Sequence, residues 1–142
     1  MRALLDVNVL IALLDADHSL HAAATRWFAA NAKEGWASCP ITQNGCIRVM
    51  SNPGYPSPLP VRAIIERLAE ATANAAHEFW PDDVSVLDAK VLEPTRVHGP
   101  RQLTDLYLVS LAVGNAGRLV TFDRSIPLEA VRGAQKKNVL VI

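Results

Sequence analysis

The chain of 142 residues carries 14 Lys and Arg residues against 14 Asp and Glu residues, so its formal net charge is zero. Its length fits one domain, and we expect residues 1–142 to form it. A balanced charge excludes proteins that attract nucleic acid through a global positive field, so any such contact must be local. Half of the residues are hydrophobic and only 6% are aromatic, which favours helices packed on a sheet.

The two cysteines, Cys39 and Cys46, belong to no Cys/His cluster, which indicates reduced thiols. Because a short apolar run stands at the start of the sequence, we expect no secretory leader. Its apolar stretches are far shorter than the ~20 residues that a membrane span needs. We therefore expect a cytoplasmic protein without membrane contact.

Five short apolar runs are each bounded by polar or turn residues, and we interpret them as buried strands at residues 3–5, 36–37, 78–80, 119–122 and 139–142. Helical spacing lies between them, at residues 9–14, 21–32, 42–50, 61–73 and 105–113. This alternation predicts an α/β fold with a central parallel five-stranded sheet and helices on both faces. The proline-rich segment 51–60 reads as a stiff surface loop, and segment 84–92 is open between a short helix and a strand.

Polar side chains follow the predicted strands at the points where the strands end. Asp6 follows the first strand, and Asp123 follows the strand at 119–122. Asn44 lies in the first turn or so of the helix after the second strand. In a parallel sheet, ligands bind beyond the carboxyl ends of the strands. These side chains are therefore expected at one edge of the sheet.

Asp105 is expected at the same edge, in the first turn of a helix. Thr104 is a good N-cap for that helix, and the buried side of the helix is expected to carry Leu108, Leu111 and Ala112.

Each of these polar residues also has a structural explanation, as a helix cap, a turn former or a surface residue. The acids are harder to explain together, because three carboxylates within ~4 Å of one another repel by roughly 4 kcal/mol per pair at an effective dielectric of 20. Such a cluster favours a bound cation, and an all-oxygen ligand set suits Mg²⁺ or Mn²⁺. His18 and His21 have a spacing that zinc sites use, but we interpret them as residues that start a helix.

Three motifs in this order resemble the PIN-domain nucleases, and among them the VapC-type toxins of bacterial toxin–antitoxin pairs. The motifs are LLDVNVL at residues 4–10, LTDLYLVSLA at 103–112 and LVTFDR at 119–124. The resemblance spans essentially the whole chain. It implies a PIN-like fold and a Mg²⁺-dependent endoribonuclease that hydrolyses RNA through a metal-activated water. It also implies a homodimer and a cognate VapB-type antitoxin.

The resemblance assigns catalytic roles to Asp6, Asn44, Asp105 and Asp123, of which the three aspartates bind the metal. One position departs from the family pattern: Asn44, four residues before Arg48, stands where the family usually has Glu. An amide can coordinate through its carbonyl oxygen or hold a water, but it carries no charge and is a poor base.

Contacts with RNA and support for the acids are assigned to residues around them. For RNA contacts the expected residues are Arg48, Arg96, Arg101 and Arg124, with His98 in the loop before Asp105. Asn8 and Thr104 are expected either to support the metal ligands or to cap helices.

Two other functions fit parts of the sequence. A phosphatase of the haloacid dehalogenase type also has an Asp after its first strand, but it requires Asp-x-Asp, and Asn8 stands in place of the second acid. A catalytically silent RNA-binding protein with the PIN fold is consistent with Asn44. The RNA that is cut leaves no trace in one sequence, because it depends on loop shapes.

Overall fold

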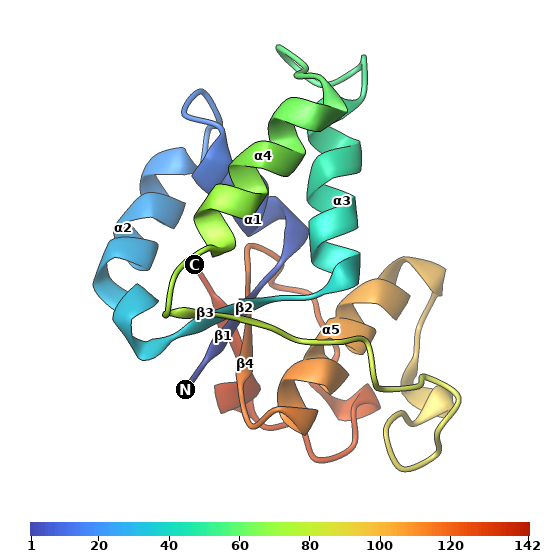
Figure 1. The fold of residues 1–142 in the computed structure, drawn as a ribbon. Helices are drawn as coiled ribbons and strands as arrows, with labels where there is room; N and C mark the ends of the chain where they lie inside the picture. The colour runs from blue at the N-terminus through green and yellow to red at the C-terminus, as the bar shows by residue number, and fades with distance from the viewer.

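The computed structural model describes all residues from Met1 to Ile142. Its centre is one sheet of five parallel strands in the order β3-β2-β1-β4-β5 (Figure 1). The strands are β1 (Ala3–Leu5), β2 (Trp36–Ser38), β3 (His77–Phe79), β4 (Arg118–Thr121) and β5 (Val139–Val141). The predicted α/β fold with a parallel five-stranded sheet is therefore confirmed.

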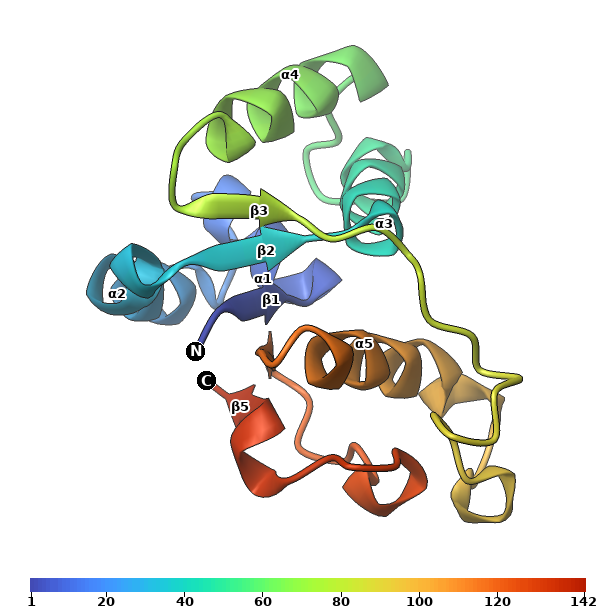
Figure 2. The same ribbon diagram turned by 60° about the horizontal axis from the view of Figure 1, so that its bottom comes forward.

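Helices cover both faces of the sheet, as predicted (Figures 1 and 2). One face carries α1 (Val7–Leu14), α2 (His21–Asn31), α3 (Pro40–Ser51) and α4 (Val61–Thr72), and the other carries α5 (Leu103–Gly114). Short 3-10 turns complete the chain: η1 (Ala32–Glu34), η2 (Pro94–Arg96), η3 (Pro100–Gln102), η4 (Leu128–Ala130) and η5 (Lys136–Asn138). None of the helices has the length and apolar composition that a membrane crossing requires.

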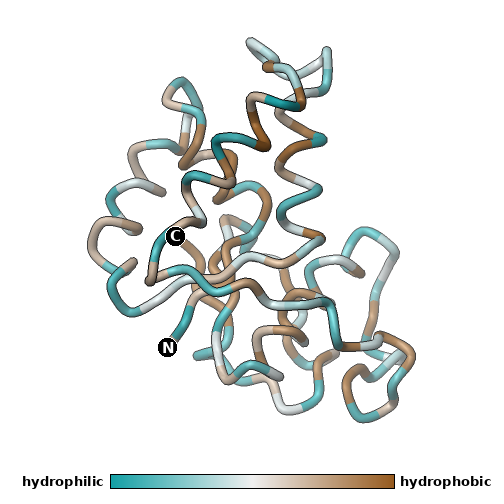
Figure 3. The backbone as a smooth tube through the Cα atoms, viewed as in Figure 1, coloured by the Kyte–Doolittle hydropathy of each residue, from teal (hydrophilic) through white to brown (hydrophobic).

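Two hydrophobic cores form because successive side chains of a strand point to opposite faces. In β1, Ala3 and Leu5 pack with α1, α3 and α4, whereas Leu4 packs with α5. In β4, Leu119 and Val120 divide between the two cores in the same way. Hydrophobic residues accordingly gather along the central strands and the helices beside them, and the loop between α3 and α4 is mostly hydrophilic (Figure 3).

The prediction that all five strands are buried was wrong for the two outer strands. β3 is mostly exposed and ends in the exposed Phe79, and β5 is only partly buried. Both lie at the edges of the sheet, where one side of a strand has no neighbour. The segment 84–92 forms turns and a single bridge between Leu92 and Val131, and the segment after Ser51 is a loop, as predicted.

Helix α5 departs further from the prediction. It begins at Leu103, and Thr104 is an exposed residue within its first turn and not its N-cap. The prediction of an amphipathic helix was also wrong, since every residue from 106 to 112 is buried. The outer face of α5 is covered by η4 and by apolar residues of the long loop before it, such as Val84 and Val97.

The order of the strands places a topological switch between β1 and β4. The chain moves from β1 to β2 and β3 on one side, and β4 and β5 lie on the other side. The Asp6 N–H donates to the Val120 carbonyl oxygen at 3.0 Å, which holds the ends of β1 and β4 side by side. In open α/β sheets, ligands bind at such a switch, outside the carboxyl ends of the strands.

Candidate active site

Asp6 lies at the carboxyl end of β1, where it caps helix α1. Its Oδ1 accepts a hydrogen bond from the Val7 N–H at 2.8 Å, and its Oδ2 accepts one from the Thr121 hydroxyl at 2.7 Å. The residue is 8% exposed. Burial raises the pKa of the Asp6 carboxyl, the two hydrogen bonds oppose that rise, and the negative charge of Asp123 adds to it.

Asp123 follows β4 by two residues and faces the same edge. Its Oδ1 accepts hydrogen bonds from both the N–H and the hydroxyl of Ser125, at 2.8 and 2.7 Å. These bonds hold the pKa of the Asp123 carboxyl below its usual value, because they stabilise the charged form. Asp123 is therefore the most readily ionised of the three acids.

Asp105 completes the group from the first turn of α5, where its side chain is half-buried. Burial, the negative charges of Asp6 and Asp123, and a hydrogen bond with Asp123 together raise the pKa of the Asp105 carboxyl to about 6. The structure thus brings together three acids from three separate segments. Their mutual repulsion favours the binding of a compensating cation among them.

The chemistry of this donor set fits a hard divalent cation. All three side chains offer carboxylate oxygens, and no thiolate or imidazole lies among the groups that shift their pKa values. No set of three His, Cys, Asp or Glu side chains is already arranged to hold one ion. The acids are therefore close neighbours and not a preformed ligand cage.

Asn44 lies on an exposed face of α3 and hydrogen-bonds to none of the three acids. The next residue, Gly45, packs against the start of α1 so closely that an added Cβ would lie 2.7 Å from Cγ2 of Val7. This approach brings the α3 backbone next to the residue that follows Asp6. Arg48, one turn further along α3, is exposed and forms no ion pair.

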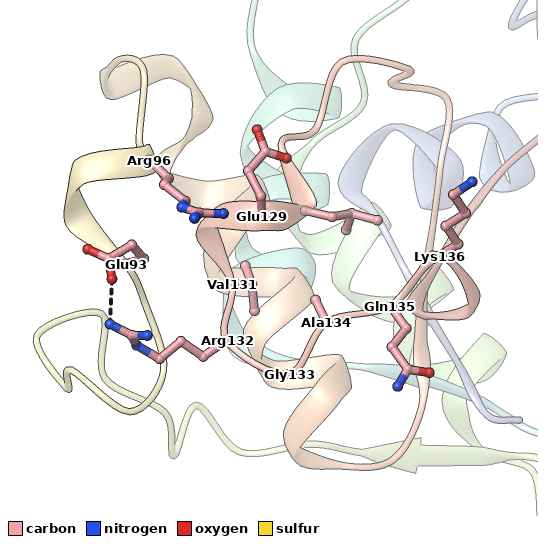
Figure 4. Close-up of a pocket in the computed structure, with 10 residues that line it drawn as sticks. Glu93, Arg96, Glu129, Val131, Arg132, Gly133, Ala134, Gln135 and Lys136 are labelled. Carbon is pink, nitrogen blue, oxygen red and sulfur yellow. Dashed lines mark hydrogen bonds and ion pairs between the residues drawn. The ribbon is translucent and has the colours of Figure 1, made fainter.

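The other arginines expected to contact RNA are also exposed and outside every ion pair of the structure. Arg124 directly follows Asp123, and Arg101 lies in η3 just before α5. Arg96 lines a separate hollow of about 690 Å³ beside η2 and η4, where Arg132 pairs with Glu93 (Figure 4). None of the three acids lines this hollow. His98 approaches Glu129 at 3.9 Å.

The residues expected to support the acids form no hydrogen bonds with them. Asn8 and Thr104 are both exposed, and neither forms a side-chain hydrogen bond to an acid. Asp6, and not Asn8, caps α1. His18 and His21 make local bonds around the start of α2, with the Leu20 N–H and with the Ala12 carbonyl oxygen.

The hydroxyl of Thr121 is the feature at this edge that sequence reasoning did not single out. It contacts Asp6 as described above, and it also accepts a hydrogen bond from the Asp123 N–H at 3.1 Å. A threonine in a strand is common and attracts little notice. The sequence feature that could have identified Thr121 is its position, in the predicted strand at 119–122 and two residues before Asp123.

The PIN domain family matches residues 3–132, which is most of the chain. This chain belongs to the PIN-domain family. Over its full length it is 55% identical to Ribonuclease VapC44 of Mycobacterium tuberculosis, which it also covers completely. It is 45% identical to Ribonuclease VapC39 of the same organism over 94% of this chain and 96% of that one.

A third relative, Ribonuclease VapC38 of Mycobacterium tuberculosis, is 43% identical over 87% of this chain and 86% of that protein. The PIN domain described here is therefore of the VapC type, as its motifs indicated. Because the chain belongs to the PIN-domain family, it is not a phosphatase of the haloacid dehalogenase type. Asp6 is instead one of three acids in a PIN fold.

Proposed function

We propose that this protein is a divalent-metal-dependent endoribonuclease and the toxin of a VapBC-type toxin–antitoxin pair. One observation carries the proposal: Asp6, Asp105 and Asp123 lie together beside the switch between β1 and β4, close enough for the charges of Asp6 and Asp123 to raise the pKa of Asp105. The relatives named as VapC ribonucleases support RNA as the substrate.

Asp6 and Asp105 would hold Mg²⁺ or Mn²⁺, and Asp123 would contact the ion directly or through water. When bound, such a cation activates water for attack and stabilises the charge that develops on the phosphate. The raised pKa of Asp105 lets this side chain carry a proton near neutral pH in the absence of metal. Metal binding then competes with that proton, so the affinity for metal should rise with pH.

The other residues at this edge bind and orient the substrate in this proposal. Arg124 and Arg101 flank two of the acids in the chain and carry charges free to meet phosphate oxygens. Arg48, exposed on α3, is a third candidate for contact with phosphate. Arg96 would contact RNA further away, at the separate hollow beside η2. Asn44 contributes a neutral amide that can position a water but cannot replace a fourth carboxylate.

The proposal also includes two partners, a VapB-type antitoxin and a second copy of the chain. A small reading frame beside the gene, whose co-expression restores growth, would support the antitoxin. Light scattering of the purified protein measures whether the chain is a dimer.

A cleavage assay separates the enzyme from a silent PIN-fold protein that only binds RNA. Purified protein is incubated with total RNA and Mg²⁺, beside an Asp105→Asn variant and an EDTA control. We expect discrete fragments from the wild type alone. Binding of RNA without any cleavage, at every Mg²⁺ and Mn²⁺ concentration tested, would favour the silent alternative instead.

A further inference from the structure

One buried hydroxyl lies between two of the three acids. The Thr121 side chain contacts Oδ2 of Asp6 at 2.7 Å and the backbone N–H of Asp123 at 3.1 Å. Thr121 is 1% exposed. Both bonds are therefore shielded from bulk water in the folded protein.

The direction of both bonds follows from hydrogen-bonding chemistry. A hydroxyl has one proton to donate and two lone pairs to accept with, and a backbone N–H can only donate. The Asp123 N–H therefore occupies a lone pair of the Thr121 oxygen, and the Thr121 proton points at Asp6. This arrangement requires Oδ2 of Asp6 to be an acceptor, as it is in the ionised carboxylate.

The consequence is a fixed orientation of the Asp6 carboxylate. Its Oδ1 is held by the Val7 N–H and its Oδ2 by Thr121. Rotation of the carboxylate would break both bonds at once, so the lone pairs left free on Asp6 keep one direction. The same hydroxyl sets the backbone of Asp123 relative to Asp6, and it ties the ends of β4 and β1 together.

We propose that Thr121 is a positioning residue for the metal ligands, which holds Asp6 and Asp123 in the arrangement that binds the cation. This inference rests on the proposed function. Partners that orient metal ligands typically change metal affinity by roughly 10- to 100-fold when they are removed. A purely structural threonine would instead affect the stability of the fold and leave the affinity of the folded protein unchanged.

The test compares Thr121→Ser with Thr121→Ala in the full chain. Both variants lose the same buried methyl group, and they differ only in the hydroxyl. Titration calorimetry with Mn²⁺ gives the Kd, and thermal melting gives the stability. Thr42→Ala is the matched control, because Thr42 is equally buried and its hydroxyl bonds only to Cys39.

We expect Thr121→Ala to raise the Kd for Mn²⁺ roughly 10- to 100-fold, with the same loss in RNA cleavage at limiting metal. Thr121→Ser should keep a Kd close to that of the wild type, although it melts at a lower temperature. Thr42→Ala should melt at a lower temperature and also keep the wild-type Kd. Should Thr121→Ala fail to fold, Thr121→Val removes the hydroxyl while it fills most of the space.

Equal Kd values for the Ser variant and the hydroxyl-free variant would overturn the positioning role, whatever their stabilities. A wild-type protein that binds no Mn²⁺ would overturn the proposed function and this inference with it. A wild type that binds Mn²⁺ and cleaves RNA, beside a hydroxyl-free variant that does both equally well, would overturn the inference alone.

Discussion

Asp6 and Val120 are joined by a backbone hydrogen bond of 3.0 Å from the Asp6 N–H to the Val120 carbonyl oxygen. This bond extends the pairing of β1 with β4 one residue beyond Leu5. The first acid is thereby anchored in the rigid sheet and not in a loop. Asp123 lies two residues beyond the end of the neighbouring strand β4, and its N–H is bonded to Thr121 of that strand. The geometry between these two acids therefore depends on the register of the sheet.

Metal binding should stabilise the fold. If the three acids bind one ion in the folded state only, Mg²⁺ at a hundred times its Kd adds about 2.7 kcal/mol to the free energy of unfolding. Thermal melting with increasing Mg²⁺ or Mn²⁺ measures this effect. The Asp6→Asn/Asp105→Asn double variant should not respond. A wild-type melting curve that ignores both ions would show that the acids do not form one site.

Asp105→Asn should stabilise the metal-free protein, and the gain should depend on pH. The pKa of Asp105 is raised from 3.8 to about 6 in the folded state. The folded protein therefore holds this proton more tightly than the unfolded chain, and ionisation costs stability as pH rises through this interval. Because the side chain is half-exposed, the cost is discounted to roughly 1 kcal/mol.

Melting of the metal-free proteins at about pH 4 and about pH 7.5 tests this linkage. The Asn variant should match the wild type in acid and exceed it at the higher pH. A variant no more stable than the wild type at the higher pH would mean that Asp105 ionises without cost.

Replacing Asn44 with Glu, the residue that the family usually has at this position, should change the Mg²⁺ requirement of cleavage. Asn44→Glu adds a negative charge on the part of α3 that lies next to α1, and attraction to a +2 ion should lower the Mg²⁺ concentration needed for cleavage. Repulsion among four acids limits the gain. Asn44→Ala should reduce cleavage only moderately if the amide positions water. If both variants match the wild type in Mg²⁺ requirement and rate, Asn44 has no part in the site.

Arg124 should contact the RNA backbone. The test uses an Asp105→Asn background, which we expect to bind RNA without cutting it. There Arg124→Ala should weaken binding and reduce the salt dependence of log K by roughly 0.7, for the loss of one phosphate contact on a single strand. Fluorescence anisotropy at several salt concentrations measures the slope. Arg26→Ala, on the exposed surface of α2, is the control and should leave the slope unchanged.

Much of the fold could be predicted because its signals are local. The run that forms β1 and the acid after it are adjacent in sequence, and parallel strands place such acids at one edge. The full burial of α5 could not be predicted, because it depends on a distant loop and on η4. The first turn of α5 was misjudged because η3 runs directly into Leu103, which leaves Thr104 inside the helix.

The candidate site could also be predicted only in part. The convergence of Asp6, Asp105 and Asp123 follows from topology, whereas the two bonds of the Thr121 hydroxyl depend on the register of β1 with β4. The sequence near Asn44 does not show whether its side chain faces solvent or the acids. That depends on how α3 packs on α1, where Gly45 approaches Val7 closely.

The central claim is that the three acids cut RNA, and the most direct measurement is the mapping of RNA 5′ ends after induced expression in cells. Wild-type protein should arrest growth and create new 5′ ends at a limited set of positions. Asp105→Asn, expressed to the same level and folded, should do neither. New 5′ ends and growth arrest of equal strength from the folded Asp105→Asn protein would contradict the account.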